Sequence, residues 1–216
     1  MNFNSKKELP LIIISILPAS FLAYLWNTLP DKVPLHWNIN EEIDRYGSKT
    51  ELLLIGLIPI FLYALLLFIP LIDPKKRLTA MGNKYYTIRL ITTLFISILF
   101  TYIIFSVKEQ SLGNPNFIFM VIGMFFMLLG NYFKTIKPNY FVGIRTPWTL
   151  ENEDIWKSTH KMGGKLWVVG GFLIIVCCFI FNKTIMNIIF LSITAVIVLV
   201  PIVYSYLKYK GNPERI

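Results

Sequence analysis

Residues 139–164 read NYFVGIRTPWTLENEDIWKSTHKMGG and form the longest polar interval between two hydrophobic blocks of the chain. The stretch combines a turn glycine, Gly143, a lone arginine, Arg145, and an amphipathic tryptophan, Trp148. Pro147 restricts the residue before it, Thr146, to extended backbone. Because connecting segments rarely hold so many specialised residues, we expect most of the specific chemistry of the chain here.

The sequence on both sides of this interval is strongly apolar. Hydrophobic residues make up 55% of the 216 residues, and the mean hydropathy is +0.60, too high for a soluble domain. A helix needs roughly 20 apolar residues to cross about 30 Å of hydrocarbon. Six blocks of about this length occur: Leu9–Leu29, Leu52–Ile72, Tyr86–Val107, Phe117–Phe133, Leu166–Phe181 and Ile185–Leu207. We therefore predict an all-α polytopic membrane protein, with residues 1–216 forming one bundle of six transmembrane helices and a short amphipathic cytoplasmic helix.

The distribution of positive charge predicts the orientation in the membrane. Of the 21 Lys and Arg residues, 16 fall on one side of the predicted bundle. The other side carries five, Lys32, Arg45, Lys49, Lys108 and Lys183. The positive-inside rule places both termini and the 139–164 stretch in the cytoplasm. The net charge of +9 thus indicates contact with the lipid bilayer rather than direct binding of nucleic acid. Lys6 and Lys7 resemble the start of a signal peptide, but the long first block favours a retained span.

Within the 139–164 stretch we predict a helix from about Leu150 to Met162, with Thr149 as its N-cap. Glu153 and Asp154 in its first turn complement the helix dipole. Trp156 would lie beside its apolar stripe. This helix either lies on the membrane surface or against the bundle, or simply leads the chain back into the fifth span. The glycine pairs Gly163-Gly164 and Gly170-Gly171, like Gly123 and Gly130, favour close helix packing over a hinge.

The first external loop, residues 30–51, is the one distinctly acidic segment. Pro30 and Pro34 predict extended backbone, while Trp37 and Tyr46 suit the headgroup layer. From Asp31 to Glu51 there are three basic residues and five acidic ones, Asp31, Glu41, Glu42, Asp44 and Glu51. The loop either steers a cationic extracellular partner or is a solvated cap.

Catalytic and metal-binding patterns are missing from the sequence. There is no His-Glu-x-x-His site, phosphate-binding loop or nucleophile elbow, and His36 and His160 are predicted on opposite membrane faces. Cys177 and Cys178 are expected to be small apolar fillers. Arg89 is expected to snorkel at the edge of the third span. We therefore predict no enzyme, no cofactor and no metal site, and the lack of mid-span charges disfavours ion-coupled transport.

The motif residues resemble the SdpI family of bacterial immunity proteins. The run Gly143 to Leu150 carries the resemblance, together with Glu153, Ile155, Trp156, Lys157, Lys165, Val168, Val169, Gly171 and Phe172. Leu29-Pro30, Val33-Pro34, His36-Trp37-Asn38 and Asp44 to Lys49 resemble a module of unknown function that often precedes it. This implies a two-span module, residues 9–72 with external loop 30–51. A four-span module, residues 86–207 with cytoplasmic loop 134–165, would follow.

The resemblance implies a multi-pass protein of the bacterial plasma membrane that protects against a secreted toxic peptide. It also implies a receptor that sequesters a cytoplasmic transcriptional repressor at the membrane. On this hypothesis a cytoplasmic partner meets Asn139, Gly143, Arg145, Thr146, Pro147, Trp148, Thr149 and Trp156. The toxin meets Pro34, His36, Trp37, Asn38, Asp44, Tyr46, Gly47 and Lys49. The alternatives are a transporter or exporter of a small molecule or peptide, and a purely structural membrane factor.

Overall fold

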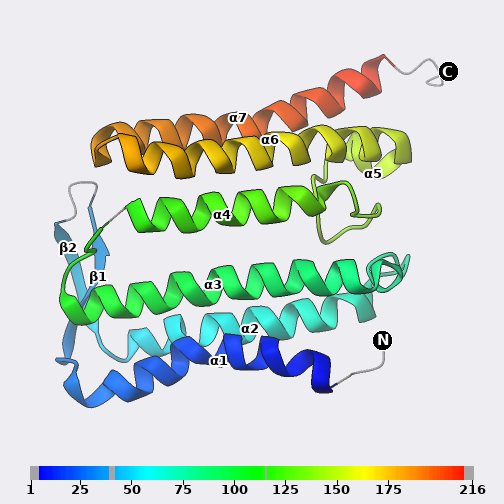
Figure 1. Cartoon of the computed structure of the whole chain (residues 1–216). Helices are drawn as coiled ribbons and strands as arrows, with labels where there is room; N and C mark the ends of the chain where they lie inside the picture. The colour runs from blue at the N-terminus through cyan, green and yellow to red at the C-terminus, as the bar shows by residue number, and fades with distance from the viewer. Residues whose placement is uncertain (1–4, 39–41, 115, 212–216) are drawn as a thin grey trace. The chain divides into compact units, whose positions relative to one another are not determined.

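Six long helices dominate the part of the chain described by this computed structural model, which comprises residues 5–38, 42–114 and 116–211. All six are long and apolar enough to cross a membrane, which confirms the predicted class, an all-α polytopic membrane protein. They are α1 (Ser5–Leu25), α2 (Glu51–Ile72), α3 (Asn83–Glu109), α4 (Asn116–Phe133), α6 (Glu153–Ile180) and α7 (Lys183–Lys210), labelled in Figure 1. The shorter elements are η1 (Trp26–Thr28), η2 (Thr79–Met81), β1 (Lys32–Trp37), β2 (Ile43–Ser48) and α5 (Pro147–Glu151). Glu41 lies outside the described residues.

The chain forms two compact units. The C-terminal unit contains residues 69–91 and the chain from Phe119 onward. The N-terminal unit contains the chain up to Phe68 and residues 92–118. This division passes through α2, α3 and α4. The two sequence modules, residues 9–72 and 86–207, remain a prediction.

The fifth predicted span begins much earlier in the structure than in the sequence analysis. Helix α6 runs without interruption from Glu153 and already contains most of the helix predicted to end near Met162. That separate helix is therefore wrong as drawn, and the short helix of this region is α5. The reason is that the first turns of α6 are covered by protein, since Ile155, Trp156 and Thr159 are all buried, so hydropathy gives no signal of their helical continuity.

Glycines let α6 approach its two neighbours in the C-terminal unit. A Cβ on Gly130 would lie 3.0 Å from the carbonyl oxygen of Gly164, and one on Gly123 would lie 2.9 Å from that of Gly171. These two contacts join α4 and α6 one heptad apart. Gly170 instead lies against Ile197 of α7, where an added Cβ would be 2.7 Å from Ile197 Cγ2. The prediction that the glycines serve packing is confirmed.

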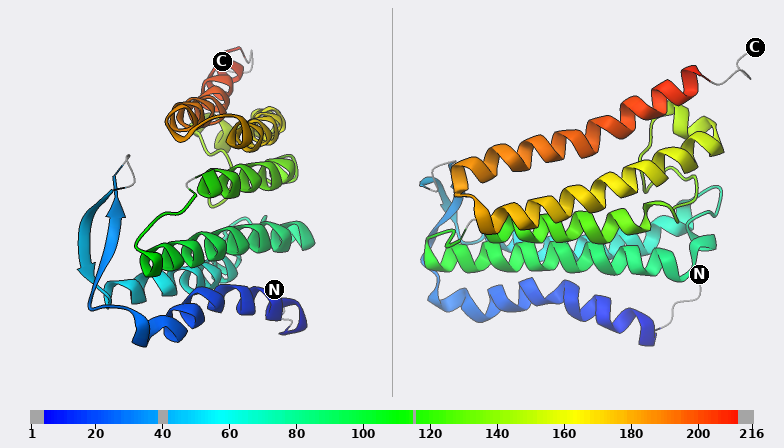
Figure 2. Two further views of the ribbon diagram at one scale, coloured as in Figure 1. Left: turned by 60° about the vertical axis from the view of Figure 1, so that its left-hand side comes forward. Right: turned by 45° about the horizontal axis from the view of Figure 1, so that its top comes forward.

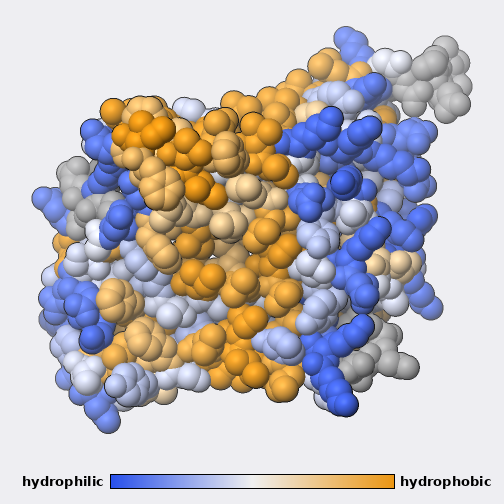
Figure 3. Space-filling model, viewed as in Figure 1, coloured by the Kyte–Doolittle hydropathy of each residue, from blue (hydrophilic) through white to orange (hydrophobic). Residues whose placement is uncertain are grey.

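Helices α6 and α7 are joined by a short turn into an antiparallel hairpin, and they lie side by side in both views of Figure 2. Asn182 caps α7 by accepting a hydrogen bond from the backbone N–H of Ile185 at 3.2 Å. Trp167 Nε1 donates to the carbonyl oxygen of Ile197 at 3.1 Å. The outward surface over α6 and α7 is hydrophobic along the middle of the helices and hydrophilic toward the end that carries α5 (Figure 3).

The N-terminal unit contains a β-hairpin that the sequence analysis described only as extended segments. Strands β1 and β2 pair antiparallel, with Val33 opposite Gly47 and Pro34 opposite Tyr46. Leu29 and Val33 join a buried cluster with Leu52 at the start of α2. Hydrophobic burial at its base therefore anchors the hairpin to the helices.

Two charged residues within the helices are buried. Arg89 of α3 is 1% exposed, so the expectation that it snorkels to the membrane edge is wrong. Glu8 of α1 is 5% exposed and accepts a hydrogen bond from the Tyr63 hydroxyl at 3.1 Å. The apolar blocks seen in the sequence did not reveal either burial, because both residues lie near a helix start where a charge is usually solvated.

Candidate functional site

The connecting loop, residues 134–152 between α4 and α6, is held together by Asn139. Its side-chain amide donates to the carbonyl oxygens of Lys137 at 2.8 Å and Val142 at 3.0 Å. Its side-chain oxygen accepts from the backbone N–H groups of Phe141 at 2.8 Å and Val142 at 2.7 Å. Asn139 is fully buried, so these bonds use both of its donors and both acceptor positions of its oxygen. Its first role is to fold the loop.

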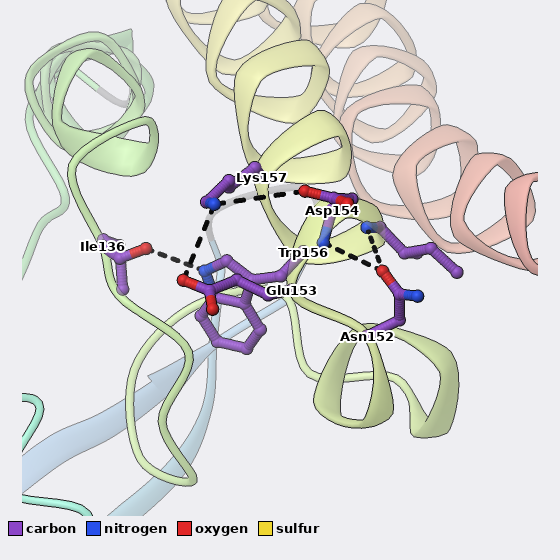
Figure 4. A network of polar contacts seen from close by, with 7 residues as sticks. Ile136, Asn152, Glu153, Asp154, Trp156 and Lys157 are labelled. Carbon is purple, nitrogen blue, oxygen red and sulfur yellow. Dashed lines mark hydrogen bonds and ion pairs between the residues drawn. The ribbon is translucent and has the colours of Figure 1, made fainter.

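Trp156 and His160, one turn apart on α6, form the surface of α6 against which the loop packs. The two rings are stacked with centroids 4.1 Å apart, and Trp156 is completely buried. Trp156 Nε1 donates to the carbonyl oxygen of Ile136 at 2.7 Å (Figure 4). This bond ties the end of α4 to the start of α6. Trp156 is therefore covered by the folded loop, and a partner could contact it only if the loop moved away.

His160 is a neutral ring with both nitrogens in use. Its Nδ1 lies 2.9 Å from the carbonyl oxygen of Trp156, which can only accept, so Nδ1 carries the proton. Its Nε2 accepts from the backbone N–H of Ile144 at 3.0 Å. Gly143 adopts a φ of +117°, and a Cβ there would collide with His160 Nε2. The turn glycine and the histidine thus form one fitted contact.

A capping box begins α5. The Thr146 side chain accepts from the backbone N–H of Thr149 at 3.2 Å, and Thr149 Oγ1 accepts from that of Thr146 at 2.9 Å, with Pro147 in the first turn. Thr146 Oγ1 also lies 3.1 Å from Ser205 Oγ on α7. The predicted N-cap, Thr149, is therefore wrong: Thr146 caps α5. Thr149 lies inside α5, which begins at Pro147, so it cannot cap the next helix. Asn152, between α5 and α6, caps α6 instead (Figure 4).

Arg145, Pro147 and Trp148 are motif residues of the loop that keep exposed surface, and two of them carry functional side chains. Arg145 is exposed and donates from its guanidinium to the carbonyl oxygen of Tyr140. Trp148 is half-buried, with its ring centroid 5.1 Å from that of Tyr206 and 6.3 Å from that of Tyr209, both on α7. The first turns of α6 add a surface ion pair, Lys157 with Glu153 at 3.7 Å (Figure 4). The loop thus presents a cation and an aromatic ring on a rigid support.

The motif residues of the hairpin also fall into two groups, those that hold it in place and those that are exposed. Pro34 is buried, and Trp37 packs against the cluster at the hairpin base. A Cβ on Gly47 would meet the ends of the Leu35 and Glu51 side chains, which would have to move to make room for it. Lys49 Nζ lies 3.1 Å from Asp31 Oδ1, which closes the end of the hairpin next to α2.

The exposed side chains of the hairpin contact mainly one another. His36 Nδ1 and Asp44 Oδ1 are 2.6 Å apart, with 63% and 43% of the side chains exposed. Asn38 accepts from the backbone N–H of Glu42 at 3.0 Å. Tyr46 is 55% exposed. This face is polar and aromatic, and none of these side chains is locked inside the protein.

Sequence reasoning missed two residues of the loop site, His160 and Ser205. His160 was considered only as a metal ligand, and its helical spacing of four from Trp156 was the available signal. Ser205 lies far from Thr146 in the sequence, and no local pattern could have paired them.

Comparison with known proteins supports the resemblance found from the motifs. Residues 135–205 match the SdpI/YfhL protein family, and residues 13–62 match a domain of unknown function, DUF1648. Over 217 aligned residues the chain is 29% identical to the immunity protein SdpI of Bacillus subtilis (strain 168), covering 97% of this chain and 100% of that protein. No solved structure matches the chain.

Proposed function

Because residues 135–205 match the SdpI/YfhL protein family and nearly the whole chain is similar to an immunity protein, we propose that the chain is a membrane immunity protein that protects its cell from a secreted toxic peptide. The observation that carries this proposal is the similarity to the immunity protein SdpI over nearly the whole chain, including both matched segments. Because the alignment covers 97% of this chain, it includes the segments that form the loop, the hairpin and the six helices here.

On this proposal the hairpin is the toxin-binding element. The distribution of Lys and Arg supports its placement outside the cell, with both termini inside. His36, Asp44 and Tyr46 offer hydrogen-bonding and aromatic surface to a peptide. Pro34, Gly47 and Lys49 act as the support that keeps these side chains in place.

The test is survival of a sensitive bacterium that expresses the full chain and is challenged with a panel of purified secreted toxic peptides. We expect protection against at least one peptide, and loss of that protection in His36→Ala and Tyr46→Ala at unchanged membrane levels. Tyr24→Ala is the matched control, because Tyr24 is 82% exposed on α1 outside the hairpin.

Failure to counter any peptide, with membrane expression verified, would contradict the immunity proposal. Uptake of a labelled peptide into proteoliposomes, in one direction only, would instead identify the chain as an exporter. Equal sensitivity of Tyr24→Ala and Tyr46→Ala would remove the hairpin from the proposal.

A finer proposal concerns the connecting loop, which would hold a cytoplasmic repressor at the membrane when toxin is bound. Arg145 and Trp148 are the side chains available to such a partner, while Asn139, Gly143 and Trp156 shape the loop that carries them. Localisation of fluorescently tagged candidate repressors from the same cell, with and without toxin, checks the idea. We expect toxin-dependent membrane recruitment that Arg145→Ala abolishes and Lys137→Ala leaves intact.

A further inference from the structure

A groove on the C-terminal unit lies between α4 and α6, close to the connecting loop. Its volume is about 430 Å³, and residues of only these two segments line it. Gly130 and Gly164, which bring the two helices together, form part of its wall. At the crossing point itself the two backbones are in close contact, since a Cβ on Gly164 would lie 2.7 Å from the carbonyl oxygen of Gly130.

Three lysines gather at this groove. Lys134 directly follows α4, and Lys161 and Lys165 lie one turn apart on the same face of α6. All three are exposed, and in the part of the chain that the structure describes none of them pairs with a carboxylate. The nearby acidic residues, Glu153 and Asp154, lie beside Lys157 instead. His160, which also lines the groove, is neutral. The groove therefore has a net positive charge, and no carboxylate of the described residues is paired with its lysines.

The other end of the groove is apolar. Val168 and Val169 line it one turn beyond Lys165, and Val169 is 55% exposed. Lys165 is also the last residue before the continuous apolar part of α6. The lysines therefore lie at the polar boundary of a predicted membrane span, and the valines lie on its hydrocarbon side.

From this arrangement we propose that the groove binds one anionic phospholipid of the surrounding bilayer. The phosphate of its headgroup lies among Lys134, Lys161 and Lys165, and an acyl chain follows α6 past Val168 and Val169. Basic pockets between transmembrane helices at the membrane surface suit such headgroups. The bound phosphate also relieves the repulsion between Lys161 and Lys165, which a helix would otherwise tolerate at a cost in stability.

The experiment measures thermal unfolding of the purified full chain in a neutral detergent, titrated with phosphatidylglycerol or with phosphatidylcholine. We expect phosphatidylglycerol alone to raise the unfolding midpoint. The variant Lys134→Gln, Lys161→Gln, Lys165→Gln should bind it roughly 100-fold more weakly, since each lysine near the headgroup contributes to affinity. The same variant should be no less stable than the parent in detergent without lipid, because the lysine repulsion is gone.

Two matched variants control for charge and for folding. Lys137→Gln, Lys157→Gln, Lys210→Gln removes the same charge away from the groove and should keep the response to phosphatidylglycerol. Lys134→Arg, Lys161→Arg, Lys165→Arg keeps the charge in the groove and should also respond. If both glutamine variants lost the stabilisation by phosphatidylglycerol equally, the proposal would be overturned. Such a result would show that the lipid responds to the net charge of the protein and not to the lysines of the groove.

A further arm separates the lipid from a simpler anion. Inorganic phosphate at the same concentration should give no stabilisation, since it lacks the acyl chain that Val168 and Val169 would hold. Equal stabilisation by inorganic phosphate would overturn the lipid assignment and leave a phosphate site. The immunity proposal is independent of these results, because the test needs no toxin.

Discussion

The connecting loop and the hairpin are both dense in motif residues, yet they use their polar side chains in opposite ways. In the loop, Asn139 and Thr149 are fully buried and bond to the backbone. In the hairpin, His36 and Asp44 bond to each other at the surface. A buried polar group must be satisfied because leaving it unpaired is costly, whereas a surface pair exchanges easily with water. The loop is thus built as a rigid support and the hairpin as an adaptable contact face.

The largest expected effect on stability comes from Trp156, against which the loop packs. Trp156→Ala removes a fully buried indole and its bond to Ile136, and we expect a loss of about 3–5 kcal/mol in the free energy of unfolding. Trp148→Ala, at a half-buried ring on the same loop, should cost clearly less. Thermal or denaturant unfolding in detergent measures both. Equal costs would contradict the assignment of Trp156 as support and Trp148 as surface.

A pair of asparagines tests the contrast between the two regions directly. Asn139→Asp keeps the shape but replaces the amide donor to two carbonyl oxygens with a carboxylate, and should destabilise the protein by about 2–3 kcal/mol. Asn38→Asp in the hairpin retains the oxygen that accepts from the backbone N–H of Glu42, but it loses the amide donor to Glu42 Oε2 and brings two carboxylates together. Because these groups are exposed and water screens them, the change should cost less than about 1 kcal/mol. Hydrogen exchange of the loop amides would localise the first effect. If the hairpin variant were the more harmful, the comparison would fail.

The capping box should have an intermediate effect. Thr146→Val keeps the size of the side chain and loses both the cap of α5 and the contact with Ser205, at a cost of about 1–2 kcal/mol. Thr146→Ser retains the hydroxyl and should unfold close to the parent midpoint. A destabilised serine variant would indicate that packing of the methyl group, rather than capping, decides stability here.

The smallest effect on stability is expected at the exposed pair of the hairpin. Asp44→Asn should change the free energy of unfolding by less than about 1 kcal/mol, since His36 and Asp44 are both largely solvated. On the immunity proposal the same change should reduce survival in the toxin challenge. Unchanged survival together with unchanged stability would show that the pair belongs to neither function nor fold.

Much of the membrane architecture could be read from the sequence. The six apolar blocks marked the six long helices, because crossing hydrocarbon demands length and low polarity in one continuous segment. The glycines at positions 123, 130, 164 and 171 indicated close packing for the same local reason, the lack of a side chain. The motifs led to the family that residues 135–205 also match.

The candidate site was only partly visible. The special residues of the loop stood out, but the roles of Asn139, Thr146 and His160 as loop supports did not. The early start of α6 escaped detection because protein, not lipid, covers its first turns. The pairing of β1 with β2 was also missed, since prolines and a bulged register hide the alternation that marks a strand.

The sequence by itself determined which segments can cross a membrane, which family motifs the chain carries and where its charges lie, because these depend on composition and spacing along the chain. Only the tertiary structure decided which motif residues are buried supports and which are free to meet a partner. The contact of Thr146 with Ser205, and the groove that Lys134 and Lys165 both line, bring together residues that are distant in sequence. Burial and charge balance at those places depend on how helices and loop pack in three dimensions.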